Sequence, residues 1–96
     1  MNKYEIMFIV KSTSGAQAIK ETASSLKKVI TDMKGKITNE RDMGRKDLAY
    51  PIKKEISGFY FVFNCNTTAE VVAEFNRKAK LNENVLRHLI IKLDEE

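Results

Sequence analysis

Two side chains of this sequence could take part in covalent chemistry: His88, the only histidine, and Cys65, the only cysteine. A nucleophile needs a neighbouring base and an orienting acid, and a metal site needs three or four converging ligands. One histidine and one cysteine supply neither arrangement. Each lies within an apolar run, so we expect both to be structural, with Cys65 a buried thiol in a reducing compartment.

Phosphate binding by a glycine-rich loop is a second chemistry to consider. Such a loop needs closely spaced glycines before a helix, and the four glycines here are dispersed, at Gly15, Gly35, Gly44 and Gly58. The segment 12–15 (STSG) precedes a predicted helix and could bind an anion at its N-terminus. Helix capping alone explains these residues, so we do not expect an anion site here. We expect no catalytic residue, no metal and no cofactor.

The strongest chemical signal is a concentration of cations in the middle of the chain. Residues 41–54 carry five basic and two acidic side chains, while the whole chain has a net charge of +4. Clustered lysine and arginine neutralise phosphates and release counterions, which is typical of RNA or DNA binding. Lysines also protect an exposed strand edge against unwanted pairing. The cations Lys46, Lys53 and Lys54 fit either purpose.

The only proline, Pro51, lies in this basic segment, where Leu48, Tyr50 and Ile52 alternate with other residues. The alternation predicts a strand. Proline has no N–H and is confined to edge strands or bulges. We therefore expect an edge strand that carries these three apolar side chains on one face.

The elements that must position these residues follow from apolar periodicity. Strands are predicted over 3–10, 36–53, 59–65 and 85–93, and helices over 15–34 and after Thr67. The segment 55–58 (EISG) is predicted to be a turn. Capping signals are expected at both helices: boxes at Ser14–Gln17 and Thr67–Glu70, and a C-terminal cap at Gly35.

Alternation also predicts which side chains are buried. The core face is expected to hold Tyr4, Ile6, Phe8, Val10, Phe59, Phe61, Phe63 and Cys65. The helices should add Ile19, Ala23, Leu26, Val29 or Ile30, Met33, Val72, Phe75 and Ala79. The opposite sheet face should keep Met7, Ile9, Tyr60 and Val62.

The order β-α-β-β-α-β predicts an α+β fold. It is a ferredoxin-like two-layer sandwich with a four-stranded antiparallel sheet and two helices on one face. The 96 residues suffice for one domain spanning 1–96, and no apolar run approaches the ~20 residues of a membrane span. We expect a soluble, cytoplasmic protein with no membrane partner. Acyl-phosphate hydrolases of this fold need an arginine in the first β-α loop, and none occurs there.

RNA-recognition domains share this element order and stack bases on aromatic residues of the third strand. Residues 57–64 (SGFYFVFN) match that pattern at four of eight positions. The phenylalanines share the more apolar face, which the helices should cover. The sequence therefore argues against a stacking platform.

The segment Gly44–Lys53 (GRKDLAYPIK) resembles the signature of the bacterial small-subunit ribosomal protein S6 family at ten consecutive positions. That signature runs glycine, any, basic, polar, Leu, Ala or Ser, Tyr, any, Ile, then basic or small. The residues 3–5 (KYE) and 83–85 (ENV), followed by Arg87, also look like this family. The resemblance covers the whole chain in length and element order.

The resemblance implies a structural protein of the small ribosomal subunit that catalyses nothing. Its partners would be the central domain of small-subunit ribosomal RNA and ribosomal protein S18, bound as a heterodimer, with no small-molecule substrate. The expected RNA contacts are Arg45, Lys46, Lys53, Lys54, Lys3 and Arg87, and the expected S18 contacts are Leu48, Tyr50, Pro51 and Ile52. The alternative is a ferredoxin-like RNA-recognition or ligand-sensing module outside the ribosome.

Overall fold

The computed structural model describes residues 2–93. The elements along the chain are β1 (Asn2–Lys11), a short 3-10 helix (Ser12–Ser14), α1 (Ala16–Asp32), β2 (Lys36–Ile52), β3 (Glu55–Thr67), α2 (Ala69–Leu81) and β4 (Val85–Leu93). The four strands form one sheet in the order β2-β3-β1-β4, and the pairs β1–β3, β1–β4 and β2–β3 are all antiparallel.

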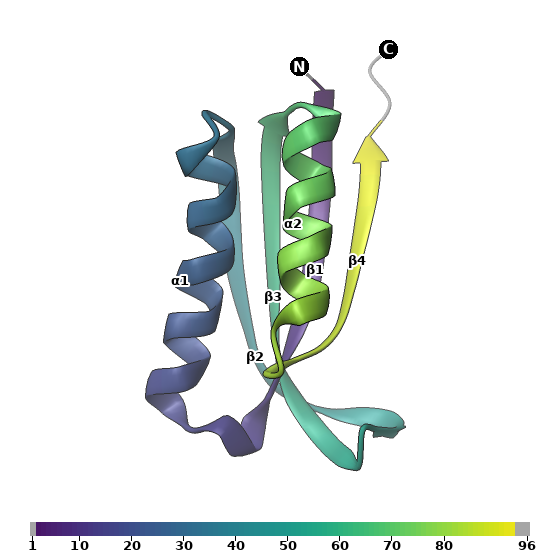
Figure 1. Ribbon diagram of the computed structural model, residues 1–96. Coiled ribbons are helices and arrows are strands. Elements are labelled where there is room, and N and C mark those ends of the chain that lie inside the picture. The colour runs from purple at the N-terminus through teal and green to yellow at the C-terminus, as the bar shows by residue number, and fades with distance from the viewer. Residues whose placement is uncertain (1, 94–96) are drawn as a thin grey trace.

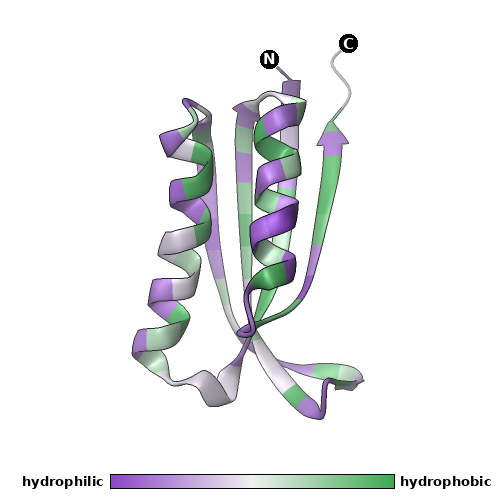
Figure 2. Cartoon of the chain, viewed as in Figure 1, coloured by the Kyte–Doolittle hydropathy of each residue, from purple (hydrophilic) through white to green (hydrophobic). Residues whose placement is uncertain are grey.

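The two helices lie side by side on one face of the sheet (Figure 1). This is the ferredoxin-like two-layer sandwich predicted from the element order. The strand β2 is an edge strand, as the presence of Pro51 in it predicts. Figure 2 shows β4 as largely hydrophobic, and the part of β2 behind α1 as largely hydrophilic. Among residues 2–93, no helix has the length and apolar character required to cross a membrane.

Phe8 lies at the centre of the core between the sheet and the helices. Its ring stacks on Phe61 with centroids 5.3 Å apart, meets Phe63 edge-on at 5.3 Å, and lies 6.2 Å from Phe75 of α2. The alternating residues predicted for β1 and β3 are buried here, except Phe59, which is partly buried against the cluster. The period-two pattern therefore identified the inner face of the sheet correctly.

The helix faces differ in detail from the prediction. In α1 the polar Thr22 is buried, and Met33, which directly follows the helix, is exposed. In α2 Val71 is buried while Val72 is partly buried. Thr22 tolerates burial because its hydroxyl donates to the carbonyl of Ala18 at 2.8 Å, which satisfies the polar group within its own helix.

Neither predicted capping box forms. The residue before α1 is Gly15 and the residue before α2 is Thr68, and neither makes a side-chain capping hydrogen bond. The hydroxyl of Ser14 instead donates to the carbonyl of Lys11 at 2.7 Å. Ser14 lies one position before the N-cap residue Gly15 and does not cap α1.

The C-terminus of α1 ends in a Schellman motif centred on Lys34 rather than on Gly35. Lys34 has a φ of 69°, its N–H donates to Thr31, and the N–H of Gly35 donates to Ile30 at 2.8 Å. Gly35 is needed for a different reason. A β-carbon there would lie 2.6 Å from Ile30 Cγ2, so only glycine fits beneath the end of the helix.

The predicted turn over residues 55–58 is wrong. The turn is formed by Lys53 and Lys54, and β3 begins directly afterwards at Glu55. The pairing partners of β3 then run from Ile52↔Glu55 through Lys46↔Gly58 to Lys36↔Asn66. Gly58 is thus a buried strand residue that suggested a turn only by its type.

Candidate nucleic-acid interface

The basic segment forms the far part of the β2–β3 hairpin, residues Gly44–Gly58, which we call the arm. Figure 1 shows the arm curving away from the layer of helices, at the bottom of the view. It carries Arg45, Lys46, Lys53 and Lys54, whose side chains are all exposed. The structure therefore places four of the six predicted RNA-contacting cations on a single projecting hairpin.

Three interruptions of the β2–β3 pairing bend this hairpin, after Ile37, after Asp42 and after Asp47. At the last one, the four residues Leu48–Pro51 lie opposite the single residue Ile56. Pro51 lies in this interruption, where its missing N–H leaves no ladder hydrogen bond unmade. Tyr50 and Pro51 are exposed, whereas Leu48 and Ile52 are partly buried.

The tip of the arm is a two-residue turn in an uncommon conformation. Lys53 and Lys54 have φ angles of 50° and 68°. Positive φ at both central positions is the conformation of a type I′ hairpin, which favours Asn-Gly because other residues meet steric resistance there. Two lysines therefore occupy positions for which their backbone preference is poor, and their ammonium groups lie at the outermost point of the hairpin.

The base of the arm is tied to the loop after β1 by hydroxyl groups. The hydroxyls of Ser12 and buried Ser57 lie 2.8 Å apart, and Arg45 Nε donates to Ser57 Oγ at 3.3 Å. Thr13 donates to the carboxylate of Glu55 at 2.8 Å. These hydroxyls are engaged within the protein, and a carboxylate adjoins them. The three hydroxyls of the loop 12–15 are therefore already engaged in contacts within the protein.

Two cations on the sheet face opposite the helices contact tyrosine rings. Arg87 of β4 donates from Nη1 to the hydroxyl of Tyr50 at 2.7 Å, and its Cζ lies 5.6 Å from the centre of that ring. Lys46 Nζ lies 5.7 Å from the centre of the Tyr60 ring. The structure thus brings Arg87 to the arm, although β4 is two strands away from β3.

Lys3, by contrast, lies far from the arm. It pairs with Asn66 and Leu93 at one end of the sheet, while Lys11 pairs with Gly58 at the base of the arm. Eight residues of extended strand separate these positions by about 27 Å. A contact of Lys3 with RNA would therefore involve a different part of the nucleic acid.

Ile56 is a candidate residue that the sequence analysis missed. Its side chain is 70% exposed, more than that of Tyr50 at 55%, and it lies opposite the interruption that contains Tyr50. The signal that could have identified it is the alternation along β3, in which Ile56 has the same parity as Tyr60 and Val62 on the face opposite the helices. That signal was obscured because Lys-Lys is not a typical turn sequence.

The aromatic platform of RNA-recognition domains is absent from the described strands. Phe61 and Phe63 are buried beneath the helices and Phe59 packs against the same cluster. On the opposite face Ile9 and Val62 are each only 5% exposed, so they offer less surface than the sequence pattern suggested. The apolar exposure on this face comes mainly from Leu89 and Ile91 of β4.

The two side chains with catalytic potential are both embedded in the fold. His88 Nε2 lies 2.6 Å from Asn76 Oδ1 of α2, and burial, together with repulsion from Lys80, lowers its pKa below the ordinary value. Burial raises the pKa of the Cys65 thiol, which makes the reactive thiolate scarcer. Both residues therefore make structural contacts within the fold, as expected from the sequence.

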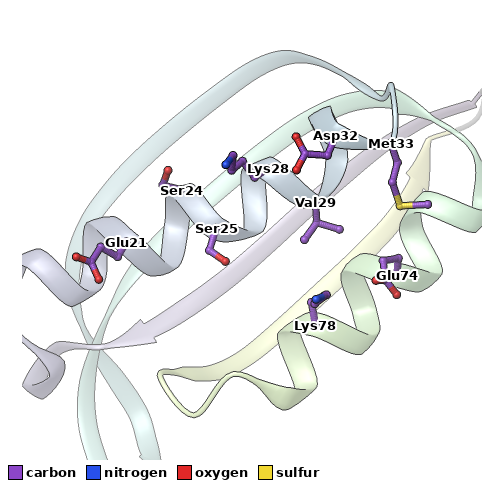
Figure 3. A pocket seen from close by; sticks show the side chains of 9 residues that line it. All are labelled: Glu21, Ser24, Ser25, Lys28, Val29, Asp32, Met33, Glu74 and Lys78. Carbon is purple, nitrogen blue, oxygen red and sulfur yellow. The ribbon is translucent and has the colours of Figure 1, made fainter.

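A groove of about 530 Å³ runs between α1 and α2 (Figure 3). Short side chains such as Ser24 and Ser25 leave it unfilled, and charges of both signs line it, including Glu21, Lys28, Asp32, Glu74 and Lys78. Within residues 2–93 no three His, Cys, Asp or Glu side chains converge as metal ligands. The groove therefore lacks the residues of a hydrolytic or metal centre.

The family model of ribosomal protein S6 matches residues 3–92 of this chain. The chain belongs to the ribosomal protein S6 family. Among solved structures, it is similar to 30S ribosomal protein S6 from Thermotoga maritima with a TM-score of 0.91 and 26% sequence identity. That match covers 96% of this chain and 87% of the other.

Membership of the S6 family makes this a small-subunit ribosomal protein with an RNA-binding, structural role. The matched range includes the whole arm.

Proposed function

We propose that this S6 protein binds the central domain of small-subunit ribosomal RNA together with ribosomal protein S18, as a heterodimer. It acts in the cytoplasm as a ribosome-associated structural component, with no enzymatic activity and no cofactor. The observation that carries the proposal is the arm, which combines exposed cations with exposed apolar side chains on one projecting hairpin.

The cations of the arm suit contact with the RNA backbone. Arg45, Lys46, Lys53 and Lys54 are exposed, and charges of this kind bind phosphates without reading the base sequence. Arg87 joins them through its contact with Tyr50, and Lys3 provides a separate contact at the other end of the sheet. The protein therefore recognises the position and shape of the RNA, and base identity contributes little.

The apolar residues of the arm suit contact with S18. Leu48, Tyr50, Pro51 and Ile52 belong to the irregular part of β2, and Ile56 lies opposite them. An amphipathic ring such as that of Tyr50 contributes large contact area at interfaces. The partner contact is therefore centred on the interruption of the hairpin, between the cations of its base and those of its tip.

The proposal is tested by reconstitution with a central-domain RNA fragment, with and without S18. Wild-type protein should bind RNA weakly alone and more strongly, with salt sensitivity, when S18 is present. Tyr50→Ala should abolish or strongly weaken the heterodimer, and Lys53→Glu/Lys54→Glu should reduce RNA affinity while the heterodimer persists.

A charge-matched control is Lys20→Glu/Lys28→Glu, which alters two exposed lysines of α1 on the opposite layer. This variant should bind RNA nearly as well as wild type. Tight, sequence-selective binding of a short single strand by the protein alone would overturn the proposal, because it would require base readout.

A further inference from the structure

Tyr50 and Arg87 are joined by the hydrogen bond and the ring contact described above, although 37 positions separate them in the sequence. We propose that the two side chains form one binding site for a single phosphate of the RNA backbone. Tyr50 orients the guanidinium and also donates its own hydroxyl proton. This inference rests on the proposed function and gives Tyr50 a second role besides contact with S18.

The count of hydrogen-bond donors supports such a site. A guanidinium carries five N–H donors, and within residues 2–93 the side chain of Arg87 makes one hydrogen bond, to the hydroxyl oxygen of Tyr50. That oxygen acts as the acceptor, so the hydroxyl proton of Tyr50 remains available to donate. The pair therefore presents donors from two strands, and both residues are exposed to solvent.

The geometry also restricts the guanidinium before any RNA arrives. Its Cζ lies 5.6 Å from the ring centre, and Nη1 is bonded to the hydroxyl at the edge of the same ring. Two contacts of this kind limit the rotamers of a long side chain, which reduces the entropy lost on binding phosphate. Within residues 2–93 the side chain of Lys46 makes only the ring contact with Tyr60, so it is less constrained.

The surroundings favour a nucleic-acid phosphate over a carboxylate of a partner protein. Tyr50 belongs to the arm, which also carries Arg45, Lys46, Lys53 and Lys54. A backbone with regularly repeated phosphates can engage several of these cations at once, whereas a single carboxylate engages one. The Tyr50–Arg87 pair then extends the row of backbone contacts from the arm onto β4.

The test compares Tyr50→Phe, Arg87→Ala and the double variant in complex with S18, using a central-domain RNA fragment at several salt concentrations. The heterodimer of each variant is first measured without RNA, and S18 is then supplied at saturating concentration, so that RNA affinity is compared between fully formed heterodimers. RNA affinity should fall by about three- to tenfold in each single variant. In the Arg87→Ala background, Tyr50→Phe should have little further effect, because the two residues act as one unit.

The salt dependence supplies a second readout. Arg87→Ala should reduce the slope of log affinity against log salt by about one, and Tyr50→Phe should also reduce it although the charge is unchanged. Tyr60→Phe serves as the control, because the hydroxyl of Tyr60 makes no hydrogen bond within residues 2–93, and it should leave RNA affinity unaltered.

Three results would overturn the inference: no loss of RNA affinity in Tyr50→Phe, equal losses in both backgrounds, or a loss of heterodimer in place of RNA binding. The wild-type complex is the reference for the proposed function itself. If wild type with S18 fails to bind the RNA, the proposed function is refuted, whereas normal wild-type binding with unaffected variants refutes only the phosphate site.

Discussion

Gly58 of β3 lies directly against Ile9 of β1, so close that a β-carbon on Gly58 would be 2.4 Å from Ile9 Cγ2. The same β-carbon would be 3.1 Å from the backbone oxygen of Val10. Strand β3 can therefore pair this closely with β1 only because residue 58 has no side chain. This contact lies at the base of the arm, where Gly58 also pairs with Lys46.

Replacing Gly58 by alanine should destabilise the protein by about 1–3 kcal/mol, the usual cost of overpacking a tight site. Urea denaturation followed by circular dichroism measures this change. Ile9→Ala alone should destabilise the protein. In the Gly58→Ala background, however, it should restore part of the lost free energy of unfolding, because it removes the Cγ2 methyl group that clashes with the new β-carbon. Additive losses in the double variant would contradict the contact.

The turn of the arm should become more stable when its backbone preference is met. Lys53→Asn/Lys54→Gly should raise the free energy of unfolding by about 1 kcal/mol, because these residues tolerate positive φ. Lys53→Gln/Lys54→Gln removes the same charges without relieving the backbone and is the matched control. Both variants should lose RNA affinity equally, because both remove the same two charges. If the two variants have equal free energies of unfolding, the positive φ angles of Lys53 and Lys54 do not strain the backbone.

Ile56 should matter for partner binding and not for folding. Since its side chain is 70% exposed, Ile56→Ser should change the free energy of unfolding by less than about 0.5 kcal/mol. It should nevertheless weaken the heterodimer with S18, as measured by calorimetric titration. Leu81 at the end of α2 is 68% exposed and gives a control, Leu81→Ser, with the same chemistry at a remote site. Equal effects of the two variants would argue against a contact at Ile56.

His88 should make stability depend on pH. Its pKa in the folded state lies below the ordinary value of 6.5, mainly because burial disfavours the imidazolium. The unfolded chain therefore takes up a proton that the folded chain does not. Stability is fully present above about pH 6.5 and falls as the pH decreases below it.

Thermal unfolding between about pH 7.5 and pH 5 measures this dependence, and His88→Gln should flatten it. The hydrogen bond and charge of Arg77 lower the pKa of Glu74 below 4.5, so Glu74 contributes only in more acidic solution. Parallel curves for wild type and His88→Gln above pH 5 would assign the effect to another group.

The inner face of the sheet was predictable because it depends on local alternation alone. Phe8 and Phe61 each lie in a run with an apolar residue at every second position, and burying that face leaves only one orientation of the strands. The order of the elements then limits the topology to a small number of folds. The resemblance of residues 44–53 to the S6 signature indicated the family.

The details of the arm could not be read from the same rules. Lys53 and Lys54 have the wrong residue types for their turn, and Gly58 has the right type for a turn but is needed for close packing. The contact between Tyr50 and Arg87 depends on the curvature that three interruptions give to the hairpin. Such curvature arises only when the two strands pair, so the sequence of either strand alone does not predict it.

The position of β1 between β3 and β4 has a consequence for how the protein is made. The first strand of the chain needs both later strands as neighbours, and its partners in β4 are the last residues of the described sheet. During synthesis one edge of β1 therefore stays unpaired until β4 has left the ribosome, since pairing between strands distant in sequence forms late. Completion of the sheet is thus delayed until the whole of β4 is available for pairing.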